Sequence, residues 1–319
     1  MKPLVIYHAN CWDGFCAAWV ARKALGDIEP FPAYYGAPPP DVKGRVVYVL
    51  DFSYPREVMA KLLTDARRTV VLDHHKTALD ALDGLHQPET GMDVIFDMTK
   101  SGGRLAWLWF WDSHFSHSPN GGRYSELVDG SGYSVTRDRA PWLVDYTEDR
   151  DMWRHALDGT EEINAALRSY PLDFDLWDQF ERKDPKSTFY YEGAAIRRAE
   201  RAIVDSHVRN ALPVDMDGHR VKAVNATVLF SEIAGELAKG QPFGACYFDR
   251  QDGKRQWSLR SDDNGVDVSA IAKAHGGGGH VHAAGYEERP AADAVGLSVD
   301  QPGSSTRVEN SSSSSSVTG

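Results

Sequence analysis

The sequence predicts an α/β fold, in which a parallel sheet with helices on both faces is followed by a smaller α+β domain. The first observation is that short apolar runs alternate with helix-spaced segments through the first half of the chain. The second is a long helical pattern at 192–208, after which strand patterns begin again. With 319 residues, the chain is long enough for two domains, each with its own core.

In the first domain, strand and helix patterns follow one another in a regular order. Apolar runs predict strands at 4–7, 46–50, 70–72 and 94–96. Apolar residues at helical spacing predict helices at 13–25 and 105–111, and Ser53 with Pro55 is typical of a helix cap and first turn. Parallel strands need a crossover between them, so this alternation favours a parallel sheet with helices on both faces.

The second half predicts a smaller domain. Strand patterns occupy 221–224, 244–248 and 256–260, and a helix pattern at 268–274 leads into the glycine run 276–279. The serine-rich end of the chain cannot bury a core. We therefore expect a first domain over 1–190, a connecting helix over 191–212, a second domain over 213–287 and a disordered tail over 288–319.

Composition limits the classes of partner and location. The net charge of -11 disfavours a stable complex with long nucleic acid, which depends on many Lys and Arg contacts with phosphates. Three cysteines cannot build a disulfide framework, no signal-peptide pattern precedes Leu4, and no apolar run approaches the length of a membrane span. We expect a cytoplasmic protein without a membrane partner.

Potential metal ligands follow three of the predicted strands, and a fourth group lies in the helical segment 145–151. The ligands at the strand ends are His8, Asp13, Asp51 and the triplet Asp73-His74-His75. The carboxyl ends of parallel strands meet at one edge of a sheet, so these side chains can converge. Mixed carboxylate and imidazole ligands suit manganese, iron or cobalt, and two such ions support hydrolysis of a phosphoester.

Each of these residues alone also has a structural explanation. Asp13 could cap its helix, Asp51 could begin an Asx turn, and a buried histidine pair could be satisfied by backbone carbonyls. Capping explains four such groups together much less well, and this favours a metal site.

Three further features suggest anion binding. The glycine run leads into His280, and backbone N–H groups in such a loop can hold an anion, although glycine-rich linkers are common. Arg260, on a preceding strand, is a second candidate, although an exposed strand arginine is the commoner case. Ser101 precedes two glycines at the start of a helix, where it either holds a phosphate oxygen or simply caps the helix.

With these motifs, the chain resembles the DHH phosphoesterase superfamily, in its branch with a DHH-associated C-terminal domain, over about residues 4–287. The matching elements, in order, are His8 to Gly14, Asp51, Asp73-His74-His75, Asp149-Arg150-Asp151, and Gly276 to His280 followed by Ala283-Ala284-Gly285. The branch includes nanoRNase-type oligoribonucleases, cyclic-dinucleotide phosphodiesterases and a single-strand exonuclease.

The resemblance implies a division of roles. His8 and Asp51 would hold a first metal ion, and a second ion would be held by Asp13, Asp51, His74 and Asp149. Asp73 would orient these ligands, and His75 would contact the scissile phosphate. A distal phosphate or the end of the nucleotide would be held by Arg260 and His280 with Gly278 and Gly279.

Two positions leave alternatives open. Many family members carry an aspartate where this chain has Cys11, and thiolate is a soft ligand poorly matched to manganese. Either Cys11 does not bind and the first ion is weakly held, or it binds and the site prefers a softer ion. Asp151 is an alternative to Asp149, because the spacing does not decide between them.

The expected activity is hydrolysis of short oligonucleotides or linear dinucleotides to mononucleotides with two divalent ions, Mn²⁺ first and Co²⁺ or Fe²⁺ as alternatives. The partner is then a short oligonucleotide or a small phosphodiester, and a homodimer is compatible with the sequence. The competing hypotheses are a hydrolase of cyclic nucleotides or other small phosphoesters, and a catalytically weak nucleotide-binding module.

Overall fold

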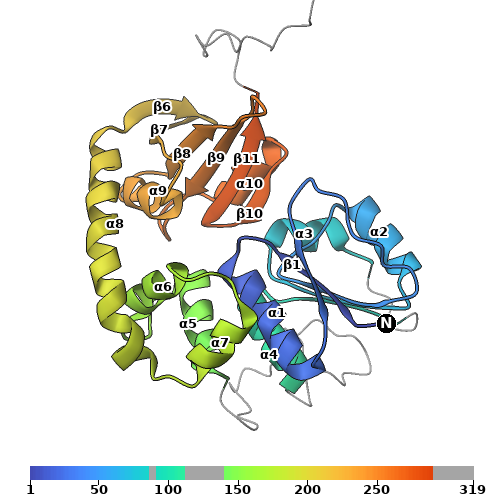
Figure 1. Cartoon of the computed structure of the whole chain (residues 1–319). Coiled ribbons are helices and arrows are strands. Elements are labelled where there is room, and N and C mark those ends of the chain that lie inside the picture. Colours follow the sequence, from blue (N-terminus) through green and yellow to red (C-terminus); the bar gives the residue numbers. More distant parts are fainter. Residues whose placement is uncertain (86–90, 112–139, 290–319) are drawn as a thin grey trace, which may run out of the picture.

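A computed structural model describes residues 1–85, 91–111 and 140–289. It has two lobes, one around a five-stranded sheet and one around a six-stranded sheet, joined by the long helix α8 (Tyr191–Arg209) (Figure 1). The predicted α/β fold class, with a parallel sheet followed by a smaller mixed domain, is confirmed.

The sheet of the first lobe is entirely parallel, with strand order β2-β1-β3-β4-β5. Its strands are β1 (Leu4–His8), β2 (Glu29–Ala33), β3 (Val46–Leu50), β4 (Arg68–Asp73) and β5 (Met92–Phe96). β2 was not predicted, because Pro30 and Pro32 hide its strand pattern. It can contain them because, among the described strands, it lies at the edge of the sheet, with β1 as its one hydrogen-bonded neighbour.

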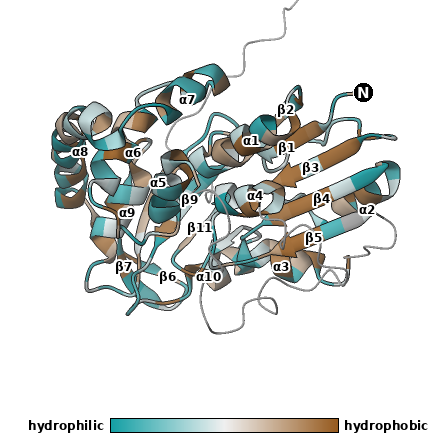
Figure 2. Cartoon of the chain, turned by 90° about the horizontal axis from the view of Figure 1, so that it is seen from below, coloured by the Kyte–Doolittle hydropathy of each residue, from teal (hydrophilic) through white to brown (hydrophobic). Residues whose placement is uncertain are grey.

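Helices cover both faces of this sheet, as the sequence predicts. Val5 and Tyr7 of β1 pack under α1 (Trp12–Leu25) and α4 (Gly102–Trp111). The alternate residues Leu4 and Ile6 pack on the opposite side, in the core that contains α2 (Arg56–Asp65) and the end of α3 (Lys76–Leu82). Both faces of the strands are therefore apolar, which Figure 2 shows as brown arrows between the helices.

A helical section completes the first lobe and leads to the second. It comprises α5 (Trp142–Asp151), α6 (Thr160–Arg168), α7 (Phe174–Glu181), a short π-helix η3 (Lys186–Tyr190) and α8. The backbones of α6 and α8 approach closely at Gly193, where an added Cβ would lie 1.7 Å from the carbonyl oxygen of Glu162. No helix in the described ranges is both long enough and apolar enough to cross a bilayer.

The second lobe has a mixed sheet with strand order β10-β11-β9-β8-β7-β6. The strands are β6 (Leu212–Met216), β7 (His219–Asn225), β8 (Gly244–Asp249), β9 (Arg255–Arg260), β10 (Gly278–His280) and β11 (Ala283–Glu288). One face packs against α10 (Val268–Ala274) and the other against α9 (Phe230–Ala238) and α8. The serine-rich tail, for which disorder was predicted, lies outside the described residues from 290 onward.

The two lobes also touch directly, at α3 and the β10 edge. Lys76 donates to Asp267 over 2.7 Å, and Lys273 donates to Asp80 over 3.0 Å. Between these pairs, Thr77 packs against the backbone of β10. This contact brings β10 over the end of β4.

Candidate metal centre

The centre forms where β1, β3 and β4 end, at one edge of the parallel sheet. Asp51 follows β3 in a left-handed conformation (φ 54°), which aspartate tolerates better than most residues. Its Oδ1 lies 3.0 Å from Nε2 of His74, and its Oδ2 lies 3.6 Å from Nδ1 of His8. The Asp51 carboxylate therefore stands between a histidine from β1 and a histidine from the end of β4.

A second group of ligand atoms lies on the His74 side. Nε2 of His74 is 3.6 Å from a carboxylate oxygen of Asp13 and 3.6 Å from one of Asp151. The backbone amides of Gly102 and Gly103, at the start of α4, donate to the Asp13 carboxylate and fix its position. A Cβ at Gly102 would lie 2.5 Å from Cβ of Asp51, so only glycine allows this approach.

Asp73 fixes the histidine pair. Its Oδ1 accepts hydrogen bonds from the backbone amides of His74 and His75 and lies 2.7 Å from Nδ1 of His75, while Ser53 donates to its Oδ2. With Nδ1 held in this way, the His75 ring presents its other nitrogen to the centre. This geometry suits the orienting role predicted for Asp73.

The electrostatics of the cluster favour a bound cation. Burial, and then the charges of Asp151 and Asp51, raise the pKa of Asp13 well above its usual value. Burial disfavours protonated His74, but the hydrogen bond to Asp51 and the charges of Asp151, Asp51 and Asp13 outweigh burial and raise its pKa to about 10. A divalent ion would relieve the repulsion between these carboxylates without a proton.

Unpartnered polar atoms support the same conclusion. Nδ1 of His8 and Oδ2 of Asp151 are buried and have no hydrogen-bond partner. Both residues belong to the groups that could hold a metal ion. Such groups are costly unless a ligand satisfies them. The residues therefore fit two divalent ions, one near His8, Asp51 and His75, and one near Asp13, His74 and Asp151.

The structure separates Asp149 from this centre, in contrast to its predicted position among the ligands. The oxygens of Asp149 accept hydrogen bonds from the amides of Ala156 and Leu157, each over 3.0 Å, and from the Thr160 hydroxyl. Asp151 occupies the place next to His74 instead. The geometry thus favours Asp151, the alternative that the sequence left open.

Cys11 lies beside the centre as a hydrogen-bond donor. Its Sγ is 3.4 Å from Oδ2 of Asp51. Burial, followed by the charge of Asp51, raises the pKa of the thiol well above its usual value. Without a metal ion in the centre, the thiol form is therefore the stable one.

His280 enters the centre from the second lobe. Its ring stacks on His75, with centroids 4.5 Å apart, and lies 4.6 Å from the ring of His74. Burial, and then the charges of His75 and His74, lower its pKa to about 2, so its ring is neutral. The residue predicted to hold a distal phosphate thus lies directly against the histidine pair.

Two of the predicted glycines determine how β10 approaches the centre. Gly279 has φ 139°, and a Cβ there would lie 2.4 Å from the carbonyl oxygen of Ala283. A Cβ at Gly278 would lie 2.8 Å from the Thr77 hydroxyl. Their role in the structure is close packing that seats His280, and no bound phosphate is needed to explain it.

Ser101 is a helix cap. Its side chain is fully buried, and its hydroxyl accepts a hydrogen bond from the amide of Arg104 over 3.2 Å. The amides of Gly102 and Gly103 are already used by Asp13. The predicted role of Ser101 in phosphate binding is therefore not supported by its position, and the simple cap is the better description.

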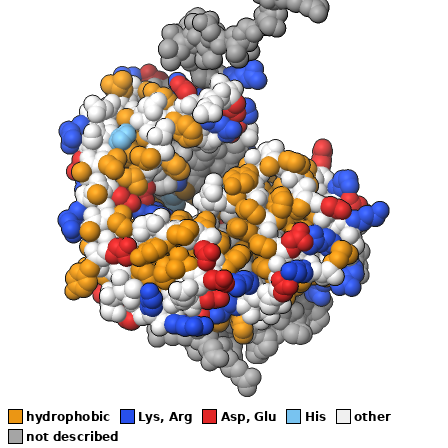
Figure 3. All heavy atoms as spheres, viewed as in Figure 1, with side chains coloured by type: hydrophobic (Ala, Val, Ile, Leu, Met, Phe, Trp, Pro, Cys, Tyr) orange, Lys and Arg blue, Asp and Glu red, His pale blue; other side chains and the backbone are white. Residues whose placement is uncertain are grey.

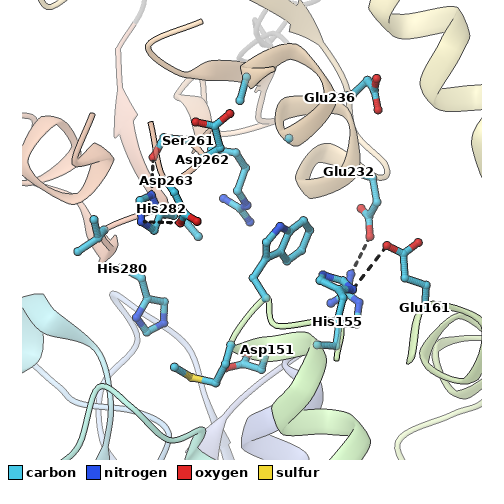
Figure 4. Close-up of a pocket in the computed structure, with 18 of the residues that line it drawn as sticks. Asp151, His155, Glu161, Glu232, Glu236, Ser261, Asp262, Asp263, His280 and His282 are labelled. Carbon is cyan, nitrogen blue, oxygen red and sulfur yellow. Dashed lines mark hydrogen bonds and ion pairs between the residues drawn. The ribbon is translucent and has the colours of Figure 1, made fainter. Parts of the chain in front are cut away.

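A cavity of about 760 Å³ opens from the centre between the two lobes, where the surface is hollowed (Figure 3). Asp151 and His280 lie on one side of it, and Glu232 and Glu236 of α9 lie on the other (Figure 4). Arg260 also lines it, with hydrogen bonds to the Ser231 hydroxyl and to the Leu259 carbonyl. Burial lowers the pKa of Arg260 to about 10, so it still carries its charge at neutral pH.

No protein-family model matches the chain. Among curated proteins, the chain is 24% identical over 307 residues to the uncharacterized protein R106 of Acanthamoeba polyphaga mimivirus, covering 88% of this chain and 66% of that protein. The chain therefore spans slightly less than two thirds of the length of this relative.

Among solved structures, the chain is similar to a DHH domain from a member of the s1p family of ribosomal proteins (13% identity, 89% of this chain and 82% of that chain, TM-score 0.47). It is also similar to the exonuclease RecJ bound to manganese (17% identity, 89% of this chain and 85% of that chain, TM-score 0.45). A third similar structure is the pGpG-specific phosphodiesterase PggH from Vibrio cholerae (13% identity, 91% of this chain and 94% of that chain, TM-score 0.41). Likeness at these levels assigns no activity, which has to come from the side chains.

Proposed function

We propose that this chain is a metal-dependent phosphoesterase of the DHH superfamily that hydrolyses short oligonucleotides or linear dinucleotides. The observation that supports this most is the position of Asp51, whose two oxygens face two separate sets of ligands. A carboxylate in this position can bridge two metal ions.

Each residue of the centre has a role in this reaction. His8 and Asp51 would hold one ion, and Asp13, Asp51, His74 and Asp151 the other. Two such ions would lower the pKa of a bound water and neutralise charge on the phosphate. Asp73 orients His75, whose free ring nitrogen can donate a hydrogen bond to a phosphate oxygen.

The cavity supports a short substrate. Its volume of about 760 Å³ falls within the range of small-ligand sites, and β10 closes the end where His280 contacts His75. Arg260, charged and on the cavity wall, suits a second phosphate of the same substrate. The formal net charge of the whole chain, -11, also disfavours a long strand, whose binding depends on many Lys and Arg contacts with phosphates.

A substrate panel tests the proposal. With Mn²⁺, we expect dinucleotides and oligomers of up to about five residues to be cleaved faster than long single strands, cyclic dinucleotides or pyrophosphate. Faster cleavage of long strands than of dinucleotides would contradict the short-substrate proposal. Preference for the cyclic compounds would favour the alternative of a cyclic-nucleotide hydrolase.

An Asp51→Asn variant tests the bridging role. Removal of a residue that merely orients a metal ligand costs about 10- to 100-fold, so loss of this carboxylate should lower kcat/KM by more than about 100-fold. Asp27→Asn, an exposed surface change, is the control and should leave activity unchanged. The enzyme proposal fails if the purified wild-type protein binds no Mn²⁺, Co²⁺ or Fe²⁺ in calorimetry and shows no turnover.

A further inference from the structure

Trp153 is an exposed aromatic residue inside the cavity. It lines the space between the lobes, yet 51% of its surface is accessible to solvent. Large aromatic side chains are usually well buried because of the apolar area they cover. An indole left open on a cavity wall therefore offers a surface to a ligand.

The backbone holds Trp153 in an unfavourable conformation. Its φ is 55°, in the left-handed region that bulky residues rarely adopt. The Trp153 amide donates to the Arg150 carbonyl over 2.9 Å, and the amides of Arg154 and His155 donate to the Asp149 carbonyl. Strain of this kind persists where surrounding contacts enforce it, and it concentrates at functional sites.

Asp149 braces the same loop with its side chain. Its carboxylate accepts the amides of Ala156 and Leu157, just beyond Trp153. Asp149 therefore holds the loop at two places, through its carbonyl next to Trp153 and through its carboxylate at the end of the loop. The backbone that carries the indole is therefore held in place, which lowers the entropy cost of ordering this part of the wall around a ligand.

The surroundings of the indole suit a flat, polar ring. The Arg150 guanidinium lies 6.0 Å from the ring centroid, and the His155 ring meets the indole edge-on at 4.9 Å. Burial, and then the charge of Arg150, lower the pKa of His155, so it is neutral at pH 7. Gly235 of α9 faces the indole edge without a side chain, and a Cβ there would lie 3.9 Å from Cζ2.

Trp153 is also close to the metal centre. It is two residues beyond Asp151, so their Cα atoms are at most about 7.6 Å apart. A nucleobase is separated from its own phosphate by a single sugar. A nucleotide can thus place its phosphate at the metal ligands and its base at the indole.

We infer that Trp153 is a stacking platform for one nucleobase of the substrate. This inference rests on the proposed function and adds a binding subsite to it. Every base has a π face, so the platform accepts purines and pyrimidines and selects for nucleotides over other phosphodiesters. Its expected contribution is that of one stacked base, about 5- to 150-fold in binding.

The test compares Trp153→Ala with Trp153→Phe on two kinds of substrate. The first kind is a dinucleotide. The second kind is a pair of abasic analogues of that dinucleotide, each of which lacks the base at one of the two positions. For Trp153→Ala, we expect KM for the dinucleotide to rise about 5- to 150-fold, with kcat unchanged. Trp153→Phe keeps an aromatic face and should stay within a few-fold of the wild type.

The abasic substrates identify the stacked base. One of the two abasic analogues lacks the base that stacks on Trp153. For that analogue, the wild type and Trp153→Ala should have the same KM. Tyr191→Ala, an exposed aromatic residue outside the cavity, is the matched control and should behave as wild type. Equal effects of Trp153→Ala on the dinucleotide and on both abasic analogues would overturn the inference.

Binding of adenosine monophosphate separates the inference from the proposed function. We expect the monophosphate to quench tryptophan fluorescence in the wild type, and Trp153→Phe to lose that part of the signal. If dinucleotides are cleaved but Trp153→Ala has the wild-type KM, the stacking inference is wrong and the function stands. If no phosphodiester is cleaved but Trp153→Ala still weakens monophosphate binding, the function is wrong and the platform stands.

Discussion

Asp149 and Asp151 lie two positions apart on α5, and their carboxylates have different partners. Residues two apart on a helix point to different sides, so both cannot face His74. Asp151 lies beside His74, and Asp149 turns to the loop that follows the helix. The sequence predicted that this segment belongs to the site but left the choice between Asp149 and Asp151 open, because α5 has no clear apolar stripe to orient it.

Asp149→Ala and Asp151→Ala should therefore impair different properties, stability in the first and metal binding in the second. Asp149→Ala removes hydrogen bonds to a charged, buried group and should lower the free energy of unfolding by about 1.5–3 kcal/mol, while folded protein still binds Mn²⁺. Asp151→Ala should leave stability nearly unchanged and weaken Mn²⁺ binding by at least tenfold. Tenfold is the smallest loss of metal affinity expected when a residue that merely orients a metal ligand is removed.

Urea titration and calorimetry with Mn²⁺ measure the two quantities on the same samples. The reverse result, with metal binding lost in Asp149→Ala and retained in Asp151→Ala, would restore the original ligand assignment. A Thr160→Ala variant is a useful control, since it loses one hydrogen bond to Asp149 without touching the metal centre.

At the scale of elements, the sequence predicted those with a clean pattern. The buried strands β1, β3 and β4 appear as apolar runs, and α1 carries large apolar residues at helical spacing within a stretch, 13–21, that is buried on all sides. β2 was missed because prolines are rare in strands, and its edge position, which permits them, is a property of the assembled sheet.

The candidate site was predictable to the extent that it depends on strand ends. The convergence of His8, Asp51 and His74 follows from the parallel order of β1, β3 and β4. The contact of His280 with His75 was not predictable, since it depends on how the two lobes dock through α3 and β10. Trp153 was also missed, because a single tryptophan after a helix carries no pattern in the sequence.

β10 provides the prediction at this scale. Gly279→Ala would place a Cβ 2.4 Å from the Ala283 carbonyl at φ 139°, so we expect a loss of about 1–3 kcal/mol in stability and displacement of His280. Gly276→Ala is the matched control, because that position also has positive φ (78°) but open space around it. It should cost only about 1 kcal/mol and leave KM for dinucleotides unchanged.

Urea unfolding and steady-state kinetics check both variants. Equal destabilisation by the two substitutions would mean that backbone conformation alone, and not the close approach to β11, makes Gly279 necessary. A wild-type KM in folded Gly279→Ala would argue that the position of His280 has no effect on substrate binding.

At the scale of the whole molecule, the site is divided between two lobes. The contacts that hold these lobes together include the α3–β10 contact and the packing of α8 against α6. Arg150 of the first lobe also donates to Glu232 of the second over 2.7 Å, at the cavity wall. The shape of the cavity therefore depends on how closely α8 packs against α6.

Gly193→Ala tests this dependence. The new Cβ would overlap the Glu162 carbonyl, so α8 has to move away from α6, at a cost of about 1–3 kcal/mol. We expect KM for dinucleotides to rise by more than KM for a small chromogenic phosphodiester, which needs only the metal centre. Ala195→Ser, at an exposed position on the same helix, is the control.

The kinetics of both substrates with Gly193→Ala give the answer, with small-angle scattering as a measure of lobe separation. A variant whose scattering changes while both KM values stay at the wild-type level would show that substrate binding does not depend on the seating of α8.

The two prolines of β2 have a consequence for association with other chains. The Glu29 amide donates to Pro3 and the Ala33 carbonyl accepts from Ala9, so these residues face β1. By alternation, Pro30 and Pro32 face outward and offer no N–H group there. An incoming strand would find acceptors without donors, so this sheet edge resists both strand-to-strand dimerisation and the growth of β aggregates.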